Sequence, residues 1–156
     1  MRIRGCNAAR RGEPDERGFT VLELLIVCLI IAILLAVAIP TFLAARTRAQ
    51  DRLVQKNLRS VFVAELTYFA DVQTYTDNAG GELEEIESGL RYGTGMTPDD
   101  TKHAWLGLAG GRVYISAKSR SGSCFYLRED SLVGTNYATD PDCKSALLQI
   151  YTADPW

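Results

Sequence analysis

One carboxylate interrupts a long apolar segment near the start of this 156-residue chain. Glu23 is followed by residues 24–39, which include no charged or strongly polar side chain. An ionised carboxylate within a membrane-spanning helix costs on the order of 2.5–3.5 kcal/mol at the bilayer centre and less near the surface. Such a group therefore marks a charged partner or a function, unless it lies among lipid headgroups and stays hydrated. The spacing alone leaves both interpretations of Glu23 open.

Four cysteines fall in three different parts of the chain. Cys6 lies in the charged N-terminal head, Cys28 in the apolar segment, and Cys124 and Cys143 in the C-terminal region. Only the last two share a region, and we predict a disulfide between them. The chain-entropy model gives a bridge with this loop length about 3 kcal/mol of stabilisation. Zinc needs more ligands than these two cysteines and the single histidine, so we expect no metal site.

Catalytic chemistry is not expected. The single histidine, His103, has no recognisable motif around it, and an enzyme needs a nucleophile with a base and an orienting group, or a set of metal ligands. The glycines at 107, 110 and 111 lack the spacing of a phosphate-binding loop. We therefore predict a protein that is not an enzyme and needs no cofactor.

The element that carries Glu23 is long enough to span a membrane. Residues 19–43 stay mostly apolar over 25 positions, and as a helix they would be about 37 Å long, against roughly 30 Å for a hydrocarbon core. A secretory signal peptide cleaved after Ala38 is one alternative, and it would release a soluble secreted domain. A plain anchor is another, but five basic residues precede the segment and five follow it closely, so charge leaves the orientation open.

Gly18-Phe19-Thr20-Val21-Leu22-Glu23, followed by an apolar helix, resembles the N-terminal signature of the type IV pilin superfamily. The resemblance implies that a prepilin peptidase removes residues 1–18 as a cytoplasmic leader by cleaving between Gly18 and Phe19. Phe19 then becomes an N-methylated terminus, and its charged amine pairs with Glu23 of a neighbouring subunit during assembly. Pro40 stands where the family commonly bends the helix. Residues 19–43 would form the transmembrane and filament-core half of this helix.

The same resemblance implies the partners and the location of the chain. It would be a single-pass protein of the cytoplasmic membrane, contacting lipid, before it joins an extracellular cell-surface filament of identical subunits. The prepilin peptidase, which is also the N-methyltransferase, and an inner-membrane assembly platform would act on it. Pseudopilins of type II secretion or competence systems share this N-terminal half, so they remain an alternative beside the secreted soluble domain.

Residues 44–72 continue the helix with an amphipathic pattern. Apolar residues recur at three- and four-residue steps: Val54, Leu58, Val61, Phe62, Leu66, Phe69 and Val72. Basic residues line much of the other side, together with two acids: Arg48, Arg52, Lys56, Arg59, Asp51 and Glu65. This side is interpreted first as a solvated face. The alternative is contact with lipid headgroups or with acids of adjacent subunits, such as Glu82, Glu84, Glu85 and Glu87.

The remainder predicts a loop followed by a small sheet. Residues 73–103 are rich in turn-forming residues, with a short helical stretch near residues 83–90, and a calcium site among their acids is the weaker interpretation. Within residues 104–156 we expect strands at residues 105–108, 112–118 and 124–128, and either a last strand or an apolar tail at residues 147–151. The expected fold class is α+β: a long N-terminal helix packed on a small antiparallel sheet.

Basic side chains near the predicted hairpin raise the question of nucleic acid. The residues are Lys118, Arg120, Arg128 and Lys144. No convincing aromatic stacking platform accompanies them, so ordinary surface is the favoured interpretation and DNA binding the weaker one. We therefore expect a structural filament subunit.

Overall fold

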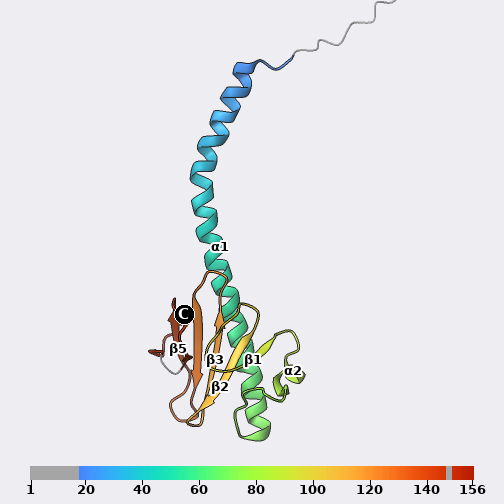
Figure 1. The fold of residues 1–156 in the computed structure, drawn as a ribbon, viewed down its shortest axis with the longest axis vertical. Coiled ribbons are helices and arrows are strands. Elements are labelled where there is room, and N and C mark those ends of the chain that lie inside the picture. The colour runs from blue at the N-terminus through green and yellow to red at the C-terminus, as the bar shows by residue number, and fades with distance from the viewer. Residues whose placement is uncertain (1–17, 147–148) are drawn as a thin grey trace, which may run out of the picture. The chain divides into compact units, whose positions relative to one another are not determined.

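A computed structural model describes residues 18–146 and 149–156 (Figure 1). The elements in chain order are α1 (Val21–Val72), α2 (Glu82–Ile86), β1 (Tyr92–Thr94), β2 (Ala104–Ala109), β3 (Arg112–Lys118), β4 (Cys124–Glu129) and β5 (Asn136–Asp140). The chain divides into two compact units, residues 1–40 and 41–156, which are described separately below. The expected leader, except Gly18, lies outside the described residues, as does Cys6.

Apart from Gly18, Phe19 and Thr20, the described part of the first unit belongs to helix α1. Its residues up to position 40 are Leu, Ile, Val and Ala with few exceptions, and none of them is buried. Among the described residues, α1 is the one helix long and apolar enough to cross a membrane. Pro40 lies inside α1, where it removes one backbone hydrogen bond. The bend that we expect at Pro40 stays a prediction.

The second unit packs one face of α1 against the sheet. Leu58, Val61 and Ala64 are buried, with Val54 and Phe62 partly buried beside them. The long helix packed on a small sheet confirms the predicted α+β class, and Figure 1 shows the strands lying along this part of α1.

Two residues of the predicted apolar stripe are not in the core. Leu66 is 40% exposed and Val72 is 50% exposed. A step of four residues from Val61 leads to position 65, so the buried face passes through Glu65 instead of Leu66. The stripe prediction was wrong at these two positions.

The sheet has five strands in the order β1-β2-β3-β4-β5. Strands β2 to β5 pair antiparallel with their sequence neighbours. Gly110 and Gly111 connect β2 to β3, with φ values of 60° and 75° that place both residues in the left-handed region. Two consecutive positive φ values characterise the type I′ turn, which matches the twist of a tight hairpin. The expected strands at residues 105–108, 112–118 and 124–128 are all present.

Both faces of the sheet are covered. Val113, Ile115 and Ala117 of β3 alternate onto the face that packs against α1. Tyr114 of β3 and Tyr126 of β4 lie on the opposite face, where they form a second buried cluster. Other members of that cluster are Cys124, Ala138 and Ala146, with Met96 and Tyr151 against it. We expected one apolar face, and the second arises because the segment after β5 folds back over the sheet.

The C-terminal half differs from the expected arrangement at two strands. Residues 73–103 contain the edge strand β1 as well as α2, and β1 pairs with β2 in parallel, so the sheet is not wholly antiparallel. The last strand is β5, which we did not predict. Residues 149–151 form no strand, which leaves the expected alternative of an apolar tail, and residues 147–148 are outside the described part. Thr152 makes an isolated bridge to Tyr137.

Candidate functional site

The first turn of α1 is organised by Thr20. Its Oγ1 accepts the backbone N–H of Glu23 at 3.1 Å, which satisfies one of the four N–H groups that a helix start leaves without an intrahelical partner. Threonine followed three residues later by glutamate is also the sequence pattern of a capping box. Phe19, just before this cap, is 79% exposed. The helix therefore begins at Val21 because Thr20 ends the non-helical segment there.

Glu23 lies in this first turn with its side chain exposed. A carboxylate is favoured here, because the N-terminal end of a helix carries a partial positive charge. No cation of the described residues lies within 4.0 Å of it. Glu23 and Phe19 thus lie four positions apart, and the described residues offer no counter-charge to the carboxylate of Glu23.

The apolar half of α1 exposes its large side chains on every side. The least exposed of them, Val27, is still 45% exposed, and Leu22 and Leu34 exceed 60%. Monomeric soluble proteins rarely expose contiguous apolar patches above a few hundred Å². This surface therefore requires lipid or other apolar helices around it.

Glu65, which we had placed on the solvated side of the helix, is fully buried. Its Oε1 accepts the backbone N–H of Thr76 at 2.6 Å, and its Oε2 has no hydrogen-bond partner. The Thr76 hydroxyl accepts the N–H of Asn78 at 2.9 Å and donates to Glu82 at 3.2 Å. Asn78 Oδ1 in turn accepts the N–H of Leu83 at 2.7 Å. This network fixes the chain between the end of α1 and α2.

Burial dominates the charge state of Glu65. Its pKa rises from 4.5 to about 7: desolvation is the largest cause, the nearby charges of Glu82 and Asp77 also raise it, and the hydrogen bond from Thr76 lowers it. Glu65 is thus a buried acid that changes protonation near neutral pH. The sequence did contain a signal for its burial, because position 65 lies seven residues after Leu58 and four after Val61, on the same helical face.

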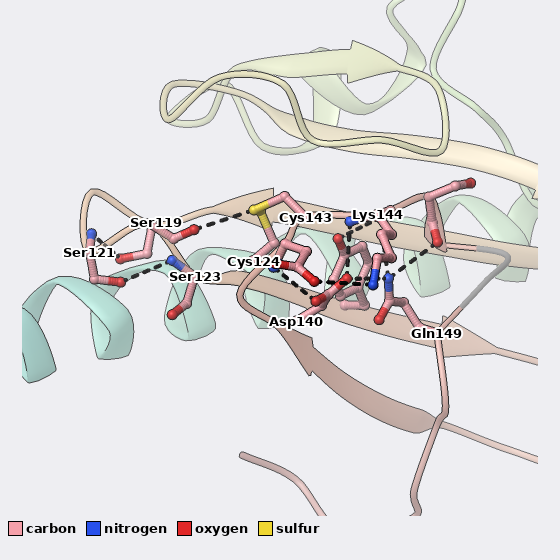
Figure 2. Close-up of a disulfide and its surroundings, with 12 residues drawn as sticks. Ser119, Ser121, Ser123, Cys124, Asp140, Cys143, Lys144 and Gln149 are labelled. Carbon is pink, nitrogen blue, oxygen red and sulfur yellow. Dashed lines mark hydrogen bonds and ion pairs between the residues drawn. A yellow bond between two sulfur atoms is a disulfide. The ribbon is translucent and has the colours of Figure 1, made fainter.

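The two predicted cysteines form a disulfide, Cys124 to Cys143, which joins the start of β4 to the segment after β5 (Figure 2). Asp140 organises that segment: its carboxylate accepts the backbone N–H groups of Asp142 and Lys144 and the side-chain amide of Gln149. These hydrogen bonds hold the pKa of Asp140 below its usual range, the bond from Asp142 most strongly. The bridge and Asp140 together hold the covering segment on the sheet.

The turn between β3 and β4 is tied to α1. Ser121 Oγ donates to Asp51 Oδ1 at 2.5 Å, and the N–H groups of Ser121 and Ser123 bond to hydroxyls within the turn. Asp51 therefore makes a structural contact with the sheet domain, although the sequence pattern placed it on the solvated side.

Metal chemistry finds no support in the described part of the chain, where no group of three or more potential ligands gathers. The acids around α2, considered for calcium, do not converge. His103 instead pairs with Asp100, with 2.6 Å between Nδ1 and Oδ2, and Asp100 also accepts the backbone N–H of His103. This arrangement shapes the loop before β2.

The basic residues considered for DNA binding are partly engaged within the chain. The guanidinium of Arg128 lies over the ring of Tyr151 at 4.6 Å from its centroid, and Lys144 pairs with Asp142 at 3.1 Å. Lys118 is half-buried and Arg120 is exposed. Two of the four charges therefore already have local partners.

Comparison with known proteins identifies the family. Residues 14–39 match the model of the prokaryotic N-terminal methylation motif. The chain is 34% identical over 112 residues to the "Type IV wide pilus major component PilA4" of Thermus thermophilus, a match that covers 69% of this chain and 86% of that protein. The chain belongs to the type IV pilin family. It is also 39% identical over 83 residues to the "Type IV major pilin protein PilA" of Myxococcus xanthus, covering 53% of this chain but only 38% of that relative's length.

In this pilin, the matched methylation motif contains Gly18, Phe19, Thr20 and Glu23. It ends before the amphipathic half of α1. The Glu65 network and the disulfide therefore belong to the part of the pilin outside the motif.

Proposed function

We propose that this pilin is the structural subunit of a type IV pilus filament. The observation that carries the proposal is the first half of α1, an apolar helix without one buried side chain and with an exposed carboxylate in its first turn. The two relatives are named as major components of type IV pili, which supports the same role. The function is assembly, and the chain itself carries out no reaction.

The proposed mechanism begins with cleavage. A prepilin peptidase removes the leader between Gly18 and Phe19 and methylates the new terminus. The terminal amine keeps its positive charge after methylation. Glu23 of one subunit then pairs with the amine of Phe19 on its neighbour, which converts an isolated carboxylate in an apolar environment into half of an ion pair.

Energetics make this pair a check on register. Removing one partner from a buried ion pair costs about 3–5 kcal/mol, because the remaining charge stays desolvated. In a subunit displaced along the filament axis, the Glu23 carboxylate and the Phe19 amine would both be buried without a partner. The apolar helix supplies the general driving force for assembly, while the Glu23–Phe19 pair selects the axial position.

The proposed location follows from the same helix. Before assembly, the apolar half of α1 spans the cytoplasmic membrane once, with lipid around its apolar side chains. During assembly, helices of other subunits replace the lipid, and the filament extends from the cell surface. An inner-membrane assembly platform would perform this extraction.

Two measurements test the proposal. Intact mass and N-terminal sequencing of the mature protein should give a chain that begins with methylated Phe19. A chain that begins at Ile39 would instead indicate signal-peptidase cleavage after Ala38 and a secreted soluble domain. Electron microscopy of sheared surface material should then show long filaments containing this chain, and their absence from piliated cells would favour a pseudopilin.

A further inference from the structure

The face of α1 that the sheet leaves exposed carries three cations that have no ion-pair partner within residues 18–146 and 149–156. Arg52, Lys56 and Arg59 are spaced four and three residues apart, so they lie along one side of the helix. No carboxylate of the described residues lies within 4.0 Å of any of them. Val63, four residues further on, is 61% exposed on the same side. Val63 thus adds an apolar side chain to this basic face.

A hollow of about 270 Å³ opens on this face. It is lined by Lys56, Arg59, Ser60, Val63 and, from the segment after α2, Glu87. The hollow combines the apolar side chain of Val63 with two cations, Lys56 and Arg59, and one acid, Glu87. Its chemistry suits an acidic segment that also offers an apolar side chain.

Helix α2 has the complementary chemistry. Glu84 and Glu85 are exposed and neither carboxylate has a hydrogen-bond or ion-pair partner in the described part of the chain. Ile86, directly after them, is 41% exposed. Leu83 is fully buried and its N–H is held by Asn78, so α2 is fixed on the domain with both acids facing outward.

We propose that α2 of one pilin docks on the exposed α1 face of a second copy, with Glu84 and Glu85 against Arg52, Lys56 and Arg59, and Ile86 beside Val63. The inference rests on the proposed filament function. The two surfaces are different patches of the same chain, so the contact is heterologous, and a pair of subunits keeps one free patch of each kind, one at each end. Heterologous contacts that do not close into a ring generate open helical polymers.

A second copy explains more of the surface than lipid does. Anionic headgroups would neutralise the three cations, but they would leave Glu84, Glu85 and Ile86 exposed and unpartnered. Docking of α2 covers all of these groups in one contact. In a filament of identical subunits, the number of α2 surfaces equals the number of basic α1 faces, because each subunit contributes one of each.

Charge reversal with rescue tests the contact in assembled filaments. One variant reverses the basic face of α1 and carries Arg52→Glu and Lys56→Glu. The other reverses the acids of α2 and carries Glu84→Lys and Glu85→Lys. We expect each to lower the yield of sheared filaments about tenfold, since attraction becomes repulsion at two positions. A chain with all four substitutions should recover most of the yield. The control variant, Lys102→Glu with Arg120→Glu, reverses two exposed cations elsewhere and should assemble normally.

Disulfide cross-linking tests the same contact and changes its charge less than the charge-reversal variants do. Lys56→Cys and Glu84→Cys are placed together in a Cys28→Ala background, which removes the free cysteine of α1. Mild oxidation of filaments should then produce a ladder of disulfide-linked chains, because each copy offers one cysteine to each neighbour. Each single substitution should give monomers only, as should the double variant dispersed in detergent.

The outcomes separate this inference from the proposed function. If the unsubstituted chain forms no filament, the proposed function fails. Filaments that form normally with either reversed surface overturn the docking of α2, as do filaments of the double-cysteine variant that give no ladder. Loss of yield without rescue in the four-fold variant also contradicts it and would instead support binding of the basic face to anionic lipid.

Discussion

The Oε1 atom of Glu65, on the buried face of α1, accepts the backbone N–H of Thr76 at 2.6 Å. This bond joins the helix to the chain that returns after it, eleven residues later. Gln73 takes a left-handed conformation at the end of the helix, with φ of 61°, and starts this return. Without Glu65, the buried N–H of Thr76 would have no acceptor. The acid therefore has a structural role that its charge did not suggest.

The raised pKa of Glu65 predicts a pH-dependent contribution to stability. In the unfolded chain the pKa is near 4.5 and in the folded domain about 7, so the contribution is fully present below pH 4.5 and is lost as the pH rises through 7. The loss amounts to about 3 kcal/mol. Glu65→Gln cannot ionise. We expect its stability relative to the wild type to rise by about that amount between pH 4 and pH 8.

Urea unfolding of the full chain in detergent, followed by the fluorescence of Trp105 and Trp156, measures this difference. Asp71→Asn, at an exposed acid on the same helix, is the matched control. Its free energy of unfolding relative to the wild type should not change across the same pH range. A Glu65→Gln difference that is also flat would contradict the burial argument.

Leu58 is the central residue of the helix–sheet contact and is fully buried. Leu58→Ala should lower the free energy of unfolding by about 2–5 kcal/mol, since it removes buried methyl groups and leaves a cavity. Leu53→Ala, at a position that is 59% exposed, should change it by no more than about 0.5 kcal/mol. Equal effects of the two substitutions would show that α1 does not pack on the sheet through this face.

The disulfide should stabilise the domain by constraining the unfolded chain. We expect Cys143→Ser to lower the free energy of unfolding by about 3 kcal/mol. Cys28→Ser should leave the domain unchanged, because Cys28 is exposed and free. Thermal unfolding with and without reductant gives an independent measurement, in which the reductant should destabilise the wild type and not the Cys143 variant.

Sequence patterns predicted the long helix, the β3–β4 hairpin and the disulfide, because each depends on local periodicity or on a small number of cysteines. They failed where contacts between distant parts of the chain determine whether a segment forms a strand or a side chain is buried. β1 is short, and its parallel partner lies across a loop, so no alternation identified it. β5 reads Asn-Tyr-Ala-Thr-Asp, in which polar and apolar residues do not alternate, and its place in the sheet is set by pairing with β4. Glu65 was misplaced because its charge outweighed its position on the apolar face.

Glu23→Ala should leave processing intact and impair assembly. The mutant chain should still have the mass of a methylated protein that begins at Phe19, since the cleavage position is unchanged. Loss of a pair that contributes about 3 kcal/mol corresponds to roughly a hundredfold weaker incorporation into filaments. Asp71→Ala, which removes an exposed acid far from the terminus, should assemble normally. Normal filament yield from Glu23→Ala would contradict the pairing mechanism.

A structure of the purified filament by electron cryomicroscopy tests the central claim most directly. We predict that the carboxylate of Glu23 lies within hydrogen-bonding distance of the terminal amine of Phe19 on an adjacent subunit, enclosed by the apolar helices. A Glu23 side chain that faces bulk water, with no positive group beside it, would contradict this account of assembly.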